Sequence, residues 1–310
     1  MRLALRAVGL LLGIVTLVFL GVRAAPGDPV DHLLGETATE SERADLRRQL
    51  HLDGPLWAQY AGMLGEIADG TLGTSRAVAG QPVPASSLIA QRLPSTLALA
   101  LASVVAAIAF ALPLGIVGAR WRGRWPDHLA RLWSLLAVSL PAFVFGPLAI
   151  FLFAVALRWA PTPAHPAHPA AALVLPAVVI GFALSGRLAR LLRSSLIEAL
   201  TSDMAQAWRA RGASARRVLW RHALPNALLP VVTLLGLQLA ALLGGALVTE
   251  KIFGRKGLGT LLLDGIAARD HAVVQGCVLA IAALYIVAMG ASSAVAAWVD
   301  PRLRRPAGDL

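Results

Sequence analysis

A chain of 310 residues that is 57% hydrophobic and 15% charged, with a mean hydropathy of +0.69, has the composition of an integral membrane protein. Its single cysteine, Cys277, excludes an internal disulfide, and the sequence has no C-x-x-C or H-E-x-x-H spacing for a zinc or haem site. The net charge of +11 falls between apolar segments instead of on one solvated face, so a nucleic-acid-binding protein is also excluded.

Six apolar runs predict six transmembrane helices. A hydrocarbon core about 30 Å thick needs roughly 20 apolar residues at helical rise. The fourth run is the shortest, and the arginines that follow it, Arg187, Arg190 and Arg193, can reach the headgroups from a helix end. Five prolines lie within or near the runs, and we expect them to kink the helices and not to break them. The runs are 7–22, 97–119, 132–157, 171–184, 227–248 and 272–299, and the prolines are Pro113, Pro141, Pro147, Pro176 and Pro230.

The first run has two interpretations. Arg2 and Arg6 precede it and Val22-Arg23-Ala24 resembles a cleavage site, so it could be a signal peptide. The run is longer than the apolar region of a usual signal peptide, which favours a membrane anchor. Arginines concentrate at the N-terminus, in 120–131, in 187–221 and at the C-terminus, so the positive-inside rule places both termini in the cytoplasm.

The segment 23–94 is too long for a simple connection and is predicted to lie outside the membrane. Thr39 and Glu42 have the spacing of a capping box and predict a short helix. Trp57, Tyr60, Ala61 and Leu64 follow at the spacing of an amphipathic helix with an aromatic face. This face could pack on the bilayer or the helix bundle, or it could bind a partner. We therefore divide the chain into an N-terminal helix (1–23), an extracytoplasmic region (24–95) and a five-helix core (96–310).

The cytoplasmic segment 187–226 predicts a helix, a tight turn and a second helix. Met204, Ala207, Trp208 and Arg211 share one helical face. Gly212 can end that helix in a left-handed turn, and a serine two residues later, Ser214, is placed to cap the next helix. By itself, such a basic hairpin could simply lie on anionic lipid.

This hairpin resembles the EAA coupling loop of the membrane subunits of binding-protein-dependent ABC importers. The family pattern is E-A-A, three residues, G, nine residues, I, one residue and L-P. Gln206, Ala207 and Trp208 occupy the first three places, and the later places are held by Gly212, His222, Leu224 and Pro225. Gln206 replaces the acid, which weakens any charge pairing to a neutral hydrogen bond, and Trp208 replaces a small residue and makes the contact surface bulkier.

Further motifs resemble the peptide and nickel branch of that family, whose subunits of this kind are called B-type permeases. They occur in the order of that branch over nearly the whole chain. A local difference is Gly254-Arg255-Lys256, where the branch usually has an aromatic residue and a proline. The motifs are PGDPV (26–30), HLDGPLWAQY (51–60), GTLGTS (70–75), RLPSTLALA (92–100), HALPNALLPVVT (222–233), GGALVTEKIF (244–253), GLGTLLLDGI (257–266) and DPRLR (300–304).

The resemblance implies an all-α, six-helix bundle of the type I ABC importer kind in a bacterial inner membrane. It also implies that this chain forms half of a translocation pathway for peptides, nickel or metal chelates, or glutathione-like solutes. The implied partners are a second, homologous permease subunit, two ATPase subunits, one of which would hold the segment from Met204 to Pro225 in a groove, and an extracytoplasmic solute-binding protein. Membrane lipid surrounds such a subunit.

The residues themselves indicate no enzyme and no cofactor site. No G-x-x-x-x-G-K-[ST] occurs, so ATP must be bound by partner subunits, and no G-x-S-x-G or pair of intramembrane aspartates supports a protease. An ion-coupled secondary transporter is the alternative function. It would need internal repeats and ionisable residues at membrane depth, and neither is evident. A scaffold protein would explain the spans but not the spacing in the hairpin.

Three smaller features remain. His165 and His168 form the only histidine pair, but prolines flank it and favour an extended linker, so no metal site is predicted. Ser139 and Gln238 are the best candidates for lining a pathway, because a polar group that faces lipid is costly. The alternative is that each forms a hydrogen bond to a neighbouring helix.

Overall fold

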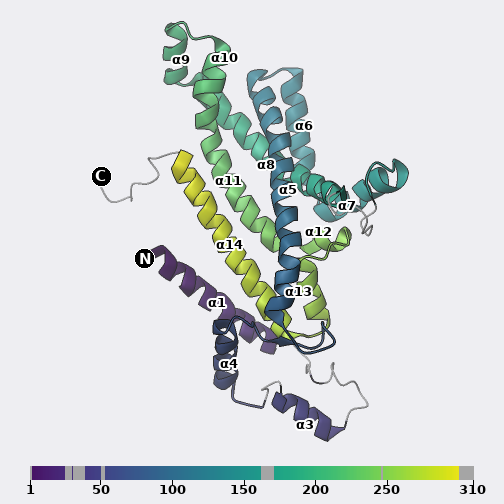
Figure 1. Ribbon diagram of the computed structural model, residues 1–310. Coiled ribbons are helices and arrows are strands. Elements are labelled where there is room, and N and C mark those ends of the chain that lie inside the picture. Colours follow the sequence, from purple (N-terminus) through teal and green to yellow (C-terminus); the bar gives the residue numbers. More distant parts are fainter. Residues whose placement is uncertain are drawn as a thin grey trace. The chain divides into compact units, whose positions relative to one another are not determined.

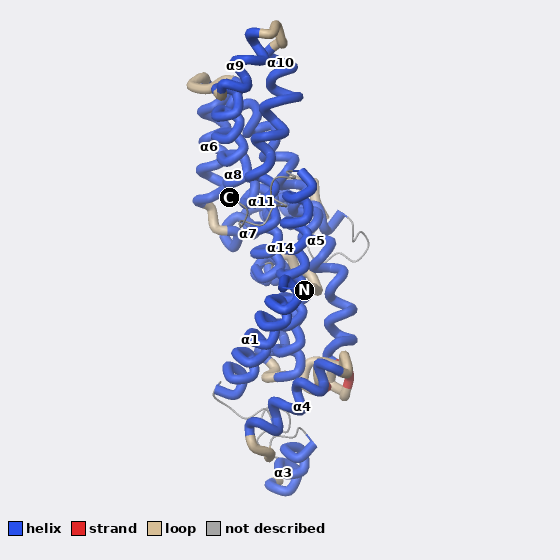
Figure 2. The backbone as a smooth tube through the Cα atoms, turned by 90° about the vertical axis from the view of Figure 1, so that its left-hand side faces the viewer, coloured by secondary structure: helices blue, strands red, loops and turns tan. Residues whose placement is uncertain are grey.

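The computed structural model describes residues 2–24, 30, 39–49, 53–161, 171–245 and 247–299, and these are almost entirely helical (Figures 1 and 2). A two-stranded antiparallel sheet pairs Thr74 with Pro84 and Ser75 with Val83. The elements, in chain order, are α1 (Arg2–Ala24), α3 (Glu40–Gln49), α4 (Leu56–Ala68), β1 (Thr74–Ser75), β2 (Val83–Pro84), α5 (Ala85–Arg120), α6 (Trp125–Ser139), α7 (Ala142–Ala149), the π-helix η1 (Ile150–Ala156), α8 (Ala171–Thr201), α9 (Asp203–Ala210), α10 (Ala215–Arg217), the π-helix η2 (Val218–Ala223), α11 (Leu224–Gly245), α12 (Leu247–Ile252), α13 (Leu258–Ala267) and α14 (His271–Val299).

The chain divides into two compact units, which are described separately. The first unit contains Met1–Thr96 and Lys256–Ile286, and the second contains Leu97–Arg255 and Val287–Leu310. Helices α5 and α14 each contribute a segment to both units.

The helices of the described residues confirm an all-α membrane bundle. Four helical segments are long and apolar enough to cross a bilayer: Ala85–Arg120, Ala171–Thr201, Ala215–Leu242 and His271–Ala297. A bent pair, Trp125–Ser139 with Ala142–Ala156, can supply a fifth span, and Gly9–Ala24 in α1 is a shorter apolar helix. Each of the six predicted runs therefore corresponds to helix in the structure.

The third predicted span is broken, so the expectation that its prolines only kink it is wrong at Pro141. Helices α6 and α7 meet at an angle of 105°. Leu140 has φ −87° and ψ 113°, because the ring of the following proline disfavours a helical conformation there, and Pro141 itself begins α7 as its N-cap. Pro176 and Pro230, in contrast, lie inside the continuous helices α8 and α11.

Two helices extend well beyond their apolar runs. Helix α8 continues through Arg187, Arg190 and Arg193 to Thr201, and the fifth apolar helix begins at Ala215 and not near 227. The reason is that an apolar run measures the bilayer thickness, whereas a helix ends where a capping residue or a glycine stops it. Most of the predicted segment 187–226 is therefore a rigid extension of two membrane helices.

Close contacts between small residues hold the second unit together. A methyl group added at Gly181 in α8 would lie 2.5 Å from the Cβ of Ala106 in α5, so only glycine allows this approach. Leu188, Leu192 and Leu196 continue the buried face of α8, in a cluster that also contains Leu219 of η2. The two helices that flank the hairpin, α8 and α11 with η2, thus share one core.

A buried carboxylate joins α6 to α8. Asp127 is fully buried, and its Oδ1 and Oδ2 accept hydrogen bonds from Arg193 Nε at 2.5 Å and Arg193 Nη2 at 2.8 Å. Arg131 Nη2 donates to Oδ2 at 2.6 Å, and the backbone N–H of Gly123 donates to the same oxygen at 2.9 Å. This bidentate network fixes the start of α6 against the cytoplasm-facing half predicted for α8.

We expect Asp127→Asn to destabilise the protein by about 3 kcal/mol, because it leaves the half-buried Arg193 without its countercharge. Asp45→Asn is the matched control. It removes an exposed salt bridge to Arg48, for which we expect a loss below about 1 kcal/mol. Thermal unfolding of the two purified variants tests this difference, and equal midpoints would contradict it.

In the first unit, α4 packs on α1, but on a face that is rotated from the predicted one. Met63 is the buried residue of α4 and contacts Val15 and Phe19 of α1 in one cluster. Tyr60 stacks edge-on against Phe19 at 5.3 Å and its hydroxyl lies 2.8 Å from the Thr16 hydroxyl. Packing on the bundle is thus confirmed for the aromatic face at Tyr60 and, in the same cluster, Leu64.

Trp57 and Ala61 lie off this packed face, and the indole of Trp57 is 75% exposed. The prediction of a capping box before α3 is confirmed. Thr39 N–H and its hydroxyl both donate to Glu42 Oε2 at 2.8 Å, and these two bonds lower the pKa of Glu42. Helix α1 packs on α4 through Val15 and Phe19, and its role as a membrane anchor stays a prediction.

Candidate functional site

The predicted hairpin forms at the end of the second unit, where α9 and α10 lie beyond the ends of α8 and α11 (Figure 1). Ser202 caps α9 by accepting a hydrogen bond from Ala205 N–H at 3.4 Å, a cap that the sequence analysis did not identify. Gly212 has φ +81°, and Ser214 accepts from Arg217 N–H at 3.3 Å. The predicted glycine turn and the predicted serine cap are both confirmed.

Hydrogen bonds tie α9 to the end of α8. Gln206 Nε2 donates to the carbonyl of Thr201 at 3.3 Å, and Arg209 Nη2 donates to that of Leu200 at 3.0 Å. These bonds fill two of the acceptor positions left open at a helix C-terminus. Gln206, which stands at the place of the family's acid, therefore caps the C-terminal end of α8 in this structure.

The buried residue of α9 is Ala205, which is not on the predicted face. Met204 is 41% exposed, and Gln206, Ala207 and Arg211 are also exposed. The helix thus presents a short surface of apolar and amide groups that the chain itself does not cover.

Trp208 lies over His222 and joins the two arms of the hairpin. Their ring centroids are 4.1 Å apart with an interplanar angle of 18°, which is a stacked pair. The Arg211 guanidinium lies 5.8 Å from the Trp208 ring, and Asn226 Nδ2 donates to the His222 carbonyl at 2.9 Å. Trp208 stands at the motif place of a small residue and His222 at that of an isoleucine, so these two departures from the pattern contact each other.

The remaining motif residues follow the stack into α11. Leu224 is half-buried and Pro225 is exposed at the point where the π-helix η2 continues into α11. Because η2 runs directly into α11, a displacement of the hairpin is transmitted along a single helical rod.

The two candidates for pathway lining lie in different environments. Ser139 is exposed at the end of α6, next to the break at Pro141. Gln238 in α11 is only 7% exposed, and its buried Nε2 has no hydrogen-bond partner among the described residues. The alternative of a hydrogen bond from that amide nitrogen to a neighbouring helix therefore has no support in the described part of the chain.

We expect Gln238→Leu to stabilise the protein by about 1–2 kcal/mol, because an unpaired buried amide nitrogen is replaced by an apolar group of similar size. If the amide also faces the pathway in another state of the transport cycle, the same variant loses uptake. Thermal unfolding and uptake are measured on the same preparation, with Gln238→Asn as the polar control. A lower unfolding midpoint for Gln238→Leu would contradict the assignment of an unpaired amide.

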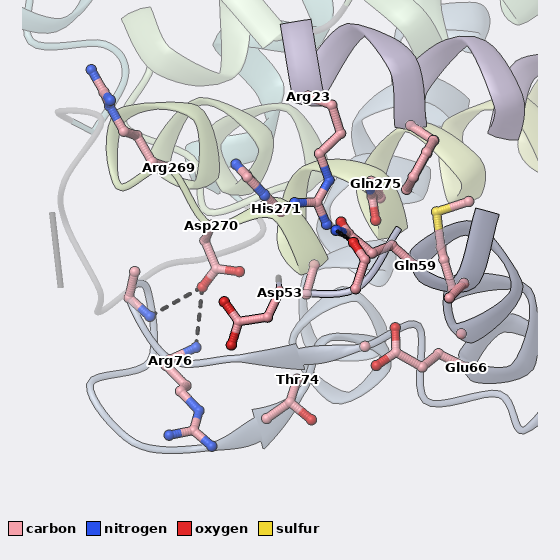
Figure 3. A pocket seen from close by; sticks show the side chains of 18 of the residues that line it. Arg23, Asp53, Gln59, Glu66, Thr74, Arg76, Arg269, Asp270, His271 and Gln275 are labelled. Atoms are coloured by element: carbon pink, nitrogen blue, oxygen red, sulfur yellow. Dashed lines mark hydrogen bonds between the residues drawn. The ribbon is translucent and has the colours of Figure 1, made fainter. Parts of the chain in front are cut away.

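A second candidate site is a cavity of about 690 Å³ within the first unit (Figure 3). Side chains from α1, α4, the β1 region and the start of α14 line it. Cationic and anionic groups are mixed on its wall. The lining residues with ionisable side chains are Arg23, Arg48, Asp53, Glu66, Arg76, Arg269, Asp270 and His271.

Asp270 organises one wall of this cavity. Its Oδ2 accepts hydrogen bonds from Ser75 Oγ at 2.7 Å and from the backbone N–H groups of Arg76, Ala77 and Val78 at 3.1–3.3 Å, two of which are drawn in Figure 3. Its Oδ1 accepts from Val273 N–H in the first turn of α14. This carboxylate, which the sequence analysis did not single out, anchors the β1 loop to that helix.

No cluster of three or more His, Cys, Asp or Glu side chains that could hold a metal ion occurs in the described ranges. His165 and His168 lie outside these ranges, and so do parts of the PGDPV, HLDGPLWAQY and GGALVTEKIF motifs and all of DPRLR.

Comparison with known proteins decides the family. The model of the binding-protein-dependent transport system inner membrane component matches residues 111–305. The chain belongs to this family. It is 38% identical to the glutathione transport system permease protein GsiC of Salmonella typhimurium LT2 over 294 residues, which cover 95% of this chain and 94% of that protein. GsiC of Escherichia coli K12 is also 38% identical, over 93% of this chain and 92% of that protein.

Solved structures show the same fold. The inward-facing MetNI methionine ABC transporter has a chain that matches with a TM-score of 0.56 at 19% identity, covering 68% of this chain and 96% of its own. An amino acid ABC transporter crystallised with histidines matches with a TM-score of 0.52 at 15% identity, covering 70% and 94%. The protein is thus a multi-pass inner-membrane permease subunit of an ABC importer. This family membership argues against the alternative function, an ion-coupled secondary transporter.

Proposed function

We propose that this chain forms half of a translocation pathway for small peptides of the glutathione class, with α9 gripped by an ATPase subunit on the cytoplasmic side. The second half is a homologous permease, and an extracytoplasmic solute-binding protein delivers the solute. ATP is bound by the two ATPase subunits and not by this chain. Both termini lie in the cytoplasm in this proposal, as the distribution of arginines predicts.

The α9 hairpin is the observation on which the coupling proposal rests. Its exposed residues Gln206 and Ala207 occupy the first two places of the coupling motif, and the exposed Met204 lies just before them. Hydrogen bonds to the end of α8 and the direct continuation of η2 into α11 make it a stiff connection to two membrane helices. When the ATPase pair closes on ATP, a shift of α9 would tilt α8 and α11 and open the bundle alternately to either side.

Two observations favour a peptide as the solute. The relatives over nearly the full chain are glutathione permeases, and the cavity of the first unit has both basic and acidic side chains on its wall. A small peptide carries carboxylates and an ammonium group, so a wall of mixed charge can pair with both ends. A volume of about 690 Å³ falls in the range of small-molecule sites.

The solute class is tested by uptake into proteoliposomes that contain the complete importer, its binding protein and ATP on the ATPase side. The panel contains radiolabelled glutathione, a dipeptide, a longer peptide and a nickel chelate. We expect ATP-dependent uptake of glutathione or another short peptide. Uptake of the nickel chelate alone would overturn the solute assignment and leave the coupling proposal intact.

A different result would overturn the coupling proposal itself. If this chain alone moved a solute into vesicles on an ion gradient, without ATPase subunits, then transport would not be driven by ATP hydrolysis through the hairpin.

A further inference from the structure

A second cavity, of about 670 Å³, lies in the second unit between α6 and α8. Four arginines line it: Arg122 from the turn before α6, Arg131 from α6, and Arg190 and Arg193 from α8. Leu135 and Ile197 form apolar parts of the same wall. The cavity is therefore basic on one part of its surface and apolar on another.

Among the described residues, acidic side chains do not balance the basic charges around this cavity. Asp127 is the acid that meets these arginines, and it is shared by Arg131 and Arg193. No salt bridge joins Arg122 or Arg190 to an acid within the described ranges of the chain, and both residues are exposed. One carboxylate against four guanidinium groups leaves a local excess of positive charge, which favours an anionic ligand with several acceptor oxygens.

The surroundings place the cavity at the depth of lipid headgroups. Trp121 and Trp125 flank the turn that contains Arg122, and their indoles are 37% and 73% exposed, as is typical of residues at a membrane interface. Leu132, Leu135 and Leu136 of α6 are 44–56% exposed, which is the pattern of a helix that faces acyl chains. A ligand that fits both the arginines and the adjoining leucines has an anionic head and an apolar tail.

We propose that this cavity binds the headgroup of an anionic phospholipid, with Arg122 and Arg190 as the groups that pair with its phosphate. Arg131 and Arg193 stay paired with Asp127 and hold the two helices together. Because α8 leads directly into α9, a bound lipid would fix the helix that supports the hairpin. The inference requires only that the chain lies in a bilayer, so it does not depend on the solute or on the coupling proposal.

The test uses the complete purified importer after delipidation, with phosphatidylglycerol, phosphatidylcholine or inorganic phosphate added back. Lipid retention is counted by native mass spectrometry, and the unfolding midpoint is measured in parallel. We expect phosphatidylglycerol to be retained and to raise the midpoint, and phosphatidylcholine to do neither. The double variant Arg122→Gln/Arg190→Gln is expected to bind phosphatidylglycerol about tenfold more weakly.

Two controls make the result specific. Arg124→Gln removes an exposed arginine from the same turn that does not line the cavity, and we expect no change in lipid retention. Arg122→Lys/Arg190→Lys keeps the charge and is expected to keep most of the binding. Equal retention by the glutamine double variant and Arg124→Gln would overturn the proposal, and so would an equal stabilisation by inorganic phosphate or by phosphatidylcholine. If an acidic surface of a partner subunit filled the cavity instead of a lipid, the glutamine double variant and Arg124→Gln would retain equal amounts of phosphatidylglycerol.

Discussion

Replacing Gly212 with valine should abolish at least nine-tenths of ATP-driven uptake while the protein still inserts into the membrane. Gly212 has φ +81°, a conformation that costs a β-branched residue more than about 1–2 kcal/mol. A Cβ at this position would meet no atom within 4 Å, so the effect of valine is on the backbone turn and not on packing. The turn sets the angle between α9 and η2, and a changed angle moves α9 away from its place in the ATPase.

Gly212→Asn is the matched control, because asparagine tolerates the left-handed conformation far better than valine does. We expect it to retain most of the uptake. ATP hydrolysis and uptake are measured together in proteoliposomes, and membrane insertion is checked by extraction. Normal uptake by Gly212→Val at the normal rate of hydrolysis would contradict the role of the turn.

The second large effect concerns the stacked pair. We expect Trp208→Ala and His222→Ile each to lower the amount of solute transported per ATP several-fold, because each removes the stack that joins the arms of the hairpin. Such a pair contributes about 0.5–1.5 kcal/mol beyond the area that it buries. The double variant Trp208→Ala/His222→Ile places a small and an aliphatic residue at the two positions, as in the family pattern, and should recover transport.

The recovery distinguishes a pair from two independent contacts. If Trp208 and His222 act together, the losses in the single variants are not additive and the double variant is better than either. A double variant whose loss equals the sum of the two single losses would show that the two side chains act independently, and would contradict the role of the stack.

The sequence was sufficient to predict most of the helices because their apolar runs reflect the bilayer thickness. It did not predict that α8 continues to Thr201, because the Ser202 cap that follows was not recognised, nor that the helix capped by Ser214 runs on without a break into the fifth apolar run. The serine cap and the glycine turn were recognisable because each acts on its immediate neighbours.

The break at Pro141 shows a second limit. Pro141, Pro176 and Pro230 all lie in apolar runs, yet only the first separates two helices. Whether a proline kinks or breaks a membrane helix depends on whether neighbouring groups satisfy the freed carbonyls, and this information is tertiary.

Contacts between distant residues were the least predictable. Asp127 and Arg193 are 66 positions apart, and Ser75 and Asp270 are 195 apart. The sequence analysis did not single out Asp127. Trp208 and His222 were each noted as occupants of motif places, but their pairing depends on the turn between them. For α4, the sequence predicted the helix correctly but placed its buried face wrongly. Met63 packs against α1, whereas the predicted Ala61 is exposed.

The most direct measurement is a disulfide cross-link from Ala207→Cys in the assembled importer to a cysteine in the facing groove of the ATPase. Ala207 is exposed on α9, and the native Cys277 is fully buried in α14, so the introduced thiol reacts selectively. Thr74→Cys, exposed in the first unit, is the control for the opposite side. We predict that Ala207→Cys cross-links to the ATPase, that the cross-link stops uptake, and that reductant restores it. A cross-link from Ala207→Cys to the solute-binding protein, or from Thr74→Cys to the ATPase, would contradict the account.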